Sequence, residues 1–237
     1  MKNKLKLFRN LFANVMIFGM LGFMLLLTYA GGVLNVFSSN DYVVHYTGDT
    51  SKQNVSLMIN VYWGTEFILS MLDVFDKYNI KTTFFIGGSW AMKNNEILIE
   101  MHNRGHEIGN HGFNHKDHKQ LSFERNEEEI YTTHKLVKSI LDIDMTLFAP
   151  PSGAFSENTL KVARNLGYET IMWNKDTVDW KIKDKQTIYE RAVKKPHGGD
   201  LILMHPTEAS LAALEDIIDF YLKKGFNLTT VSENISL

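Results

Sequence analysis

The sequence contains no cysteine and has almost no net charge, and both features exclude whole classes of function. Without cysteine among its 237 residues, the chain has no disulfide, thiolate metal site, cysteine nucleophile or lipid-modified cysteine. A formal net charge of −2 at pH 7 gives no sign of a surface for nucleic acid, so we expect no nucleic-acid partner. The Gly-x-Ser-x-Gly nucleophile turn and the glycine loops that bind phosphates or dinucleotides are missing as well.

A long apolar run lies near the N-terminus. Residues 1–10 are basic, and residues 11–30 carry no charge. Twenty residues at helical rise cross a hydrocarbon core of about 30 Å, and basic flanks stay in the cytoplasm. We therefore predict a cytoplasmic tail over 1–10, a single-pass membrane anchor over 11–30 and an extracytoplasmic domain. A signal peptide cleaved after Ala30 is the alternative, although its apolar run is usually shorter. Residues 31–54 are rich in Gly, Ser, Asn and Asp and are predicted to be a linker.

From residue 55 to 237 the chain alternates between short apolar runs and amphipathic segments with helical spacing. Near-continuous apolar runs are typical of parallel strands buried on both faces. Seven are predicted, at 55–61, 81–86, 106–110, 145–149, 169–173, 201–204 and 228–231. Helices are predicted between them, including 122–141, 156–166, 186–193 and 208–224. This α/β alternation favours a doubly wound sheet or a barrel.

Polar and aromatic residues follow the predicted strands, at the ends that would meet on one face of a parallel barrel, where active sites lie. The candidates are Asn60, Tyr62 and Trp63 after the first strand, His111 and His115 after the third, Pro151, Ser152 and Gly153 after the fourth, Asp176, Asp179 and Trp180 after the fifth, and His205 after the sixth. Two imidazoles four residues apart are a candidate pair of ligands for zinc or a similar divalent metal. Purely structural roles are the alternative: tryptophans often pack in cores, and aspartates form turns or cap helices. His118 is expected to be a solvated neighbour of the histidine pair.

These motifs, in this order, resemble those of the polysaccharide deacetylases of the NodB-homology type, carbohydrate esterase family 4. The resemblance covers about residues 55–235, and it rests on the metal motif His111-x-x-x-His115, the groove motif 148–153, Asp176-x-x-Asp179-Trp180 and Leu203-x-His205. It implies a distorted (β/α)₇ barrel that removes N-acetyl groups from a cell-wall aminosugar polymer such as peptidoglycan or a chitin-like glycan. A sporulation-associated subgroup of Gram-positive bacteria has a similarly lengthened turn after the first strand.

The resemblance also implies roles for individual residues. His111 and His115 would hold a divalent metal, with zinc as the expected ion. Asp179 would orient His205, which would protonate the leaving amine, and the backbone N–H of Ser152 would help to hold the oxyanion. The predicted contacts to the sugar come from Tyr62, Trp63, Pro151, Ser152, Gly153 and Trp180.

The first motif departs from the family pattern. The family usually carries two consecutive aspartates after the first strand, one for the metal and one as the general base, and neither is present here. Aligned on the strand, the first aspartate becomes Asn60; aligned on Gly64, the pair becomes Tyr62 and Trp63. We favour the alignment on the strand.

Two further departures lie in the other motifs. Ala149 stands where the family has the arginine that pairs with the base carboxylate, and Gly112 replaces a Ser or Thr. A buried arginine without its carboxylate would cost several kcal/mol, so the two losses belong together. Two functions follow. One is a metal-assisted deacetylase in which Asp176 replaces the base or no protein base acts. The other is a catalytically impaired glycan-binding or scaffold protein that keeps the groove.

Overall fold

The computed structural model describes residues 11–12, 14–26 and 42–237, which divide into a short N-terminal unit and a folded unit, Tyr42–Leu237. Residues 11–12 and 14–26 are helical, and their apolar side chains are exposed. In these described ranges no helix is long and apolar enough to cross a membrane. The predicted tail over 1–10, residues 13 and 27–30 of the predicted anchor and residues 31–41 of the predicted linker lie outside the described residues.

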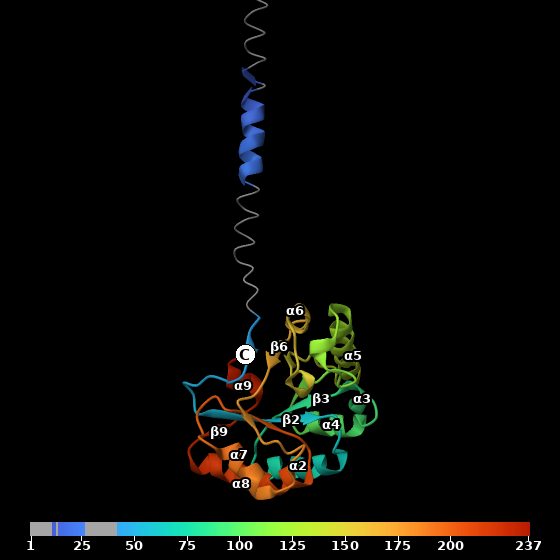
Figure 1. Ribbon diagram of the computed structural model, residues 1–237, viewed down its shortest axis with the longest axis vertical. Coiled ribbons are helices and arrows are strands. Elements are labelled where there is room, and N and C mark those ends of the chain that lie inside the picture. Colours follow the sequence, from blue (N-terminus) through green and yellow to red (C-terminus); the bar gives the residue numbers. More distant parts are fainter. Residues whose placement is uncertain (1–10, 13, 27–41) are drawn as a thin grey trace, which may run out of the picture. The chain divides into compact units, whose positions relative to one another are not determined.

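The folded unit is organised around a parallel sheet (Figure 1). The strands run in the order β1-β6-β5-β4-β3-β2-β8-β7, and β9 (Asn227–Leu228) pairs with β2 outside this path. Their bounds are β1 Val44–His45, β2 Asn54–Val61, β3 Thr83–Ile86, β4 Glu107–Asn110, β5 Leu147–Phe148, β6 Glu169–Ile171, β7 Lys175–Asp176 and β8 Leu201–Met204. Because the order begins at β1 and ends at β7, the α/β fold is an open parallel half-barrel.

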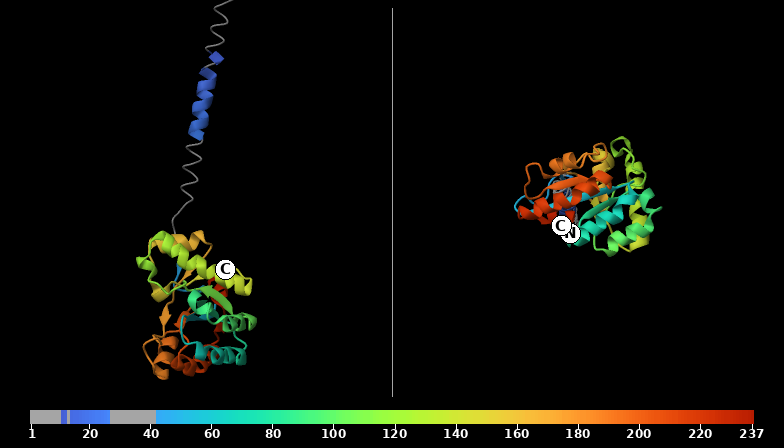
Figure 2. Two further views of the ribbon diagram at one scale, coloured as in Figure 1. Left: turned by 90° about the vertical axis from the view of Figure 1, so that its right-hand side faces the viewer. Right: turned by 90° about the horizontal axis from the view of Figure 1, so that it is seen from below.

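Helices connect most of the strands and cover the outside of the sheet (Figure 2). They are α2 Thr65–Lys77, α3 Gly88–Ala91, α4 Asn95–Asn103, α5 Phe123–Leu141, α6 Glu157–Asn165, α7 Lys185–Val193, α8 Glu208–Lys223 and α9 Val231–Ile235. The side chains of Ser122 and Ser156 cap α5 and α6, which fixes the starts of these helices where the sequence places them. In Figure 1, α2, α7 and α8 lie next to one another along one side of the unit.

The alternation of side chains along β2 separates two hydrophobic clusters. Leu57, Ile59 and Val61 point outward and pack with the covering helices. Met58 points inward, into a smaller cluster within the half-barrel that also contains Phe85, Leu147, Ala149, Ile171, Leu201 and Val231. With side chains alternating at every residue, Asn60 is directed to the same inner side as Met58. The strand therefore turns an amide toward the interior at its carboxyl end.

The structure corrects two predicted boundaries. The linker was predicted to extend to residue 54, but β1 pairs with β6 and the Gly48 amide donates to the Gly199 carbonyl oxygen (2.7 Å), so residues 42–54 belong to the folded unit. The last strand was predicted over 228–231. Instead β9 ends at Leu228, and Val231 begins α9, which Thr230 and Glu233 close with a reciprocal capping box.

Candidate active site

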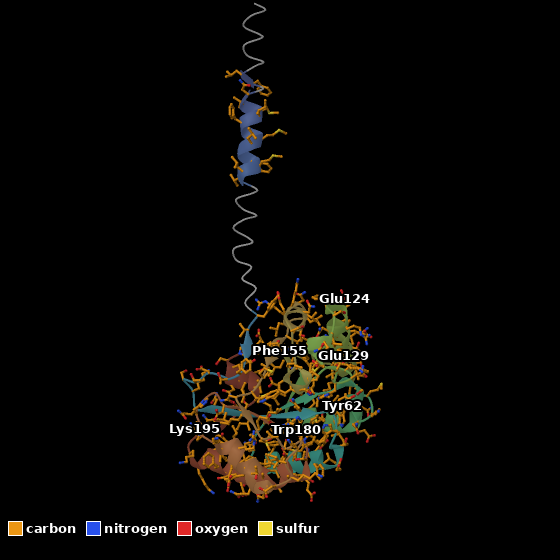
Figure 3. The ribbon with its side chains drawn as sticks, viewed as in Figure 1. Tyr62, Glu124, Glu129, Phe155, Trp180 and Lys195 are labelled. Atoms are coloured by element: carbon orange, nitrogen blue, oxygen red, sulfur yellow. The ribbon has the colours of Figure 1, made fainter. Side chains whose placement is uncertain are left out.

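A pocket of about 380 Å³ opens where the carboxyl ends of the strands meet. We call it the central pocket. It is lined by Asn60, Tyr62, Trp63, His111, His115, Ser152, Trp173, Asp176, Trp180, Leu203 and His205. Figure 3 labels Tyr62 and Trp180 among them. Most of the residues selected from sequence are therefore brought together. Three are not lining residues: Asp179 lies buried behind His205, and Pro151 and Gly153 shape the turn that carries Ser152.

The two histidines of the metal motif are held in the form that a metal ion binds. His111 follows β4, and its Nδ1 lies 2.7 Å from the Ala149 carbonyl oxygen, so this nitrogen carries the proton and leaves the Nε2 lone pair available. The ring of His115 lies 5.1 Å from that of His111, centroid to centroid. Burial holds the pKa of His111 well below its usual value and also lowers the pKa of His115. Both imidazoles are therefore expected to be neutral at neutral pH.

A buried carboxylate fixes the loop between the two histidines. Glu129 on α5 accepts hydrogen bonds from the backbone amides of Phe113 (2.9 Å) and Asn114 (2.7 Å) and from the Asn114 side chain (2.9 Å). These bonds support the left-handed backbone of Gly112 (φ 70°) and His115 (φ 53°). A non-glycine residue in this conformation is disfavoured and persists where surrounding contacts hold it. Sequence reasoning missed Glu129, because nothing in the pattern of α5 distinguishes this glutamate from its exposed neighbours.

His118 is buried, so the expectation that it would be a solvated neighbour is wrong. Its Nδ1 lies 2.7 Å from the Asn126 side-chain oxygen, and burial lowers its pKa. A Cβ atom placed on Gly112 would lie 2.9 Å from His118 Nε2. The buried imidazole thus occupies the space that a Ser or Thr side chain would need, which accounts for the glycine in the metal motif.

Asn60 presents an unpaired amide oxygen at the central pocket. The residue is 3% exposed, and its Oδ1 has no hydrogen-bonding partner within the described part of the chain. A buried, unpaired polar atom is costly and calls for an explanation, such as a water or an ion. No group of three or more His, Cys, Asp or Glu side chains in the described ranges could hold a metal ion. The donor set that fits a divalent metal is therefore two neutral imidazoles, with the Asn60 oxygen as the available third donor.

His205 and Asp179 form a second group of candidate functional residues, and His205 lines the central pocket. His205 Nδ1 lies 2.7 Å from Asp179 Oδ1, and the His205 backbone amide donates to Asp179 Oδ2 (2.6 Å). The Ser210 hydroxyl also donates to Oδ2. Trp63 stacks on the imidazole with the rings 5.6 Å apart and 8° from parallel. These contacts fix the ring and leave Nε2 as the nitrogen available to the pocket.

The remaining lining residues come from turns. Asp176 ends β7, and its side chain accepts a hydrogen bond from the Val178 amide (2.7 Å), which uses one carboxylate oxygen in a turn. Ser152 has a left-handed backbone (φ 55°) in the short turn after β5. A Cβ on Gly153 would lie 2.8 Å from the ring of Trp173, so only glycine fits there. Trp180 is 58% exposed, unlike a core tryptophan.

Residues 47–171 match the family model for polysaccharide deacetylase. Among similar proteins of known sequence, the chain is 36% identical to the protein YlxY of Bacillus subtilis (strain 168), over 79% of this chain and 59% of YlxY. The peptidoglycan-N-acetylmuramic acid deacetylase PdaA of the same organism is 30% identical, over 81% of this chain and 75% of PdaA. The chain thus spans less than two thirds of the length of YlxY.

The fold is also similar to solved structures. A protein of Bacillus anthracis, described as a pseudoenzyme of carbohydrate esterase family 4, superimposes with a TM-score of 0.80 at 31% identity, over 82% of this chain and 69% of that chain. With the family model matching more than half of the chain, and the motif residues gathered at one pocket, this protein is a member of the polysaccharide deacetylase family.

Proposed function

We propose that this chain is a slow, metal-assisted N-deacetylase of a cell-wall aminosugar polymer. The observation that carries the proposal is the central pocket, in which two neutral imidazoles and an imidazole oriented by a carboxylate face the same space. A divalent metal held by His111 and His115, with the Asn60 oxygen as a third donor, would polarise the acetyl carbonyl and the attacking water. Zinc is the expected ion, since imidazole ligands suit it.

The chain's own residues supply the remaining steps. Water adds to the acetyl carbon, and the Ser152 N–H would help to hold the oxygen that becomes negative. As the C–N bond breaks, His205 gives a proton from Nε2 to the leaving amine, while Asp179 stabilises the charged imidazole. The water's proton goes to Asp176, the carboxylate among the lining residues, or to solvent. Tyr62, Trp63 and Trp180 offer aromatic faces for the sugar rings.

A second function has an observation in its favour. Asn60 is an amide where the family has its base carboxylate, and Ala149 leaves no arginine to pair with one. An amide cannot accept a proton from water at neutral pH, and a positioned base is worth about 10²–10⁴-fold in rate. The alternative is therefore a glycan-binding or scaffold protein that keeps the groove without turnover.

Acetate release from N-acetylglucosamine oligomers and from peptidoglycan strands, with zinc or cobalt added, separates the two functions. We expect slow release from the wild type and none from His205→Ala, with glycan binding kept in both. Oligomer binding that is lost in Trp180→Ala, together with no acetate release from the wild type, would replace the deacetylase with the binding protein. No binding and no release would reject both.

For the location, we propose that the apolar run over residues 11–30 anchors the chain in the cell membrane, with the folded unit outside the cytoplasm. The support is the basic flank followed by twenty uncharged residues. Protease added to intact protoplasts should remove the folded unit, while a cytoplasmic marker survives. A folded unit that remains intact until the cells are lysed would show that the proposed topology is wrong.

A further inference from the structure

A second hollow, of about 840 Å³, adjoins the central pocket. It lies along the edge strand β7 and helix α7, and it shares Asp176 with the central pocket. We call it the basic groove. It is lined by Asn174, Lys175, Asp176, Thr187, Glu190, Arg191, Val193, Lys194, Lys195 and His197. Figure 3 labels Lys195, a lining residue of the basic groove, and Trp180, a lining residue of the central pocket.

Cations outnumber acids along the groove, although the chain as a whole has a net charge of −2. The acidic lining residues are Asp176 and Glu190, against three lysines and an arginine. One of these lysines, Lys175, is paired with buried Asp200, which leaves three cations against two acids. Arg191, Lys194 and Lys195 are exposed, and none of the ion pairs among the described residues involves them. Such a local excess of unpaired positive charge attracts anionic ligands.

The turn that carries Lys194 and Lys195 is held in place by the buried side chain of Lys175. The Lys175 side chain is 7% exposed and forms an ion pair with buried Asp200 (3.4 Å). Its Nζ also donates to the carbonyl oxygen of Lys194 and to that of Lys195, the latter at 3.3 Å. Lys195 has a left-handed backbone (φ 46°), which these bonds hold in place. The exposed lysines therefore project from a rigid turn.

Arg191 is also oriented, and it stands at the boundary between the two hollows. Its Nε donates to the backbone oxygen of Asp176 (2.9 Å), the residue that lines both. In the described part of the chain, its two terminal nitrogens have no hydrogen-bonding partner. Two parallel N–H groups of this kind match the two oxygens of a carboxylate.

We infer that the basic groove binds a carboxylate carried by the glycan beside the amino sugar in the central pocket. The inference rests on the proposed function, and it narrows the substrate class to an anionic wall glycan such as peptidoglycan, in preference to a neutral chitin-like polymer. Two groups on such a glycan carry a carboxylate. One is the lactyl ether of muramic acid, and the other is a peptide stem attached to that ether.

Binding by the full chain to three glycans tests the inference: an N-acetylglucosamine tetramer, glycan strands stripped of peptides and strands that keep their peptides. The wild type should bind the anionic strands about tenfold more tightly than the neutral tetramer, and the ratio should fall as salt is raised. Arg191→Gln should reduce the ratio severalfold, and Lys194→Gln with Lys195→Gln should do the same. Arg191→Lys keeps the charge without the planar fork and should give an intermediate ratio.

A matched control changes the same charge elsewhere. Lys93→Gln with Lys135→Gln removes two exposed lysines that line none of the hollows described above, and it should leave the ratio as in the wild type. Preference for both anionic glycans assigns the lactyl carboxylate, and preference only for strands with peptides assigns the stem. Equal affinity for neutral and anionic glycans overturns the inference. The proposed function is unaffected by that result, because the chain would still bind the neutral tetramer. A chain that binds none of the three refutes both.

Discussion

The effect of the missing base carboxylate on the rate can be tested by introducing the carboxylate together with its arginine partner. Asn60 lies opposite Phe85 on β3, Phe85 lies opposite Gly109 on β4, and Asn110 lies opposite Phe148 on β5. This register sets Asn60 level with Leu147, and Ala149 comes two residues further on the same, inner face. The variants Asn60→Asp and Ala149→Arg therefore direct a carboxylate and a guanidinium into the same interior.

The expected changes in rate and stability follow from the burial of these two positions. Asn60 is 3% exposed, so desolvation would raise the pKa of a lone aspartate there and keep much of it protonated, which leaves little ionised carboxylate to act as a base at neutral pH. Ala149 is fully buried, and a lone arginine there would destabilise the fold by about 3–5 kcal/mol, as unpaired buried charges do. In the double variant we expect the introduced carboxylate and guanidinium to pair with each other. We expect Asn60→Asp to raise the rate less than about tenfold and the double variant about 10²-fold, within the range of a positioned base.

The assay is acetate release from N-acetylglucosamine oligomers with added zinc or cobalt, measured together with thermal unfolding. The double variant should be more stable than Ala149→Arg and faster than the product of the two single effects, as direct partners require. Asn60→Asp with Ala149→Lys is the matched control, because lysine supplies the charge without the two-pronged geometry. A fast wild-type enzyme that is indifferent to both positions would refute this reasoning, and Asp176→Asn would then be the first variant to examine.

Three further predictions concern the histidines. Zinc affinity measured by calorimetry should be weak in the wild type and lost when His111→Ala and His115→Ala are combined; unchanged binding would reject the ligand assignment. Asp179→Asn should slow acetate release about 10²-fold or more without changing zinc affinity, because it frees the His205 ring; a parallel loss of zinc binding would instead indicate a disturbed pocket. Burial lowers the pKa of His106 from 6.5 to about 4, so the unfolded chain takes up this proton first as the pH falls. The free energy of unfolding should therefore decline between about pH 6.5 and 4, by up to about 3 kcal/mol for this group, and less steeply in His106→Gln; equal slopes in denaturant titrations would contradict the assignment.

The parallel α/β fold could be predicted because its strands are apolar runs buried on both faces. Such runs can be recognised in the sequence without knowing which strands are neighbours. The carboxyl ends of parallel strands meet on one face, and this expectation correctly placed Asn60, His111 and His205 at one pocket. The strands β1 and β7 were not predicted, because each has only two residues and neither lies in an apolar run as long as the one around β5.

Residues that matter through contacts distant in sequence were missed as well. Glu129 lies on a helix with glutamates before it, and only its bonds to the loop distinguish it. The basic groove was not visible either, because its cations come together only when β7 lies beside α7. The predicted roles of the pocket residues remain predictions.

The three hydrogen bonds that Glu129 receives from the loop between His111 and His115 have a consequence for how ligands arrive. The loop is ordered by the protein alone, so little conformational entropy remains to be lost when an ion or sugar binds. The amide hydrogens of Phe113 and Asn114 should therefore exchange slowly with solvent whether or not zinc is present. A ligand would meet a preformed surface, and its association rate would be set by diffusion and desolvation and not by folding of the loop.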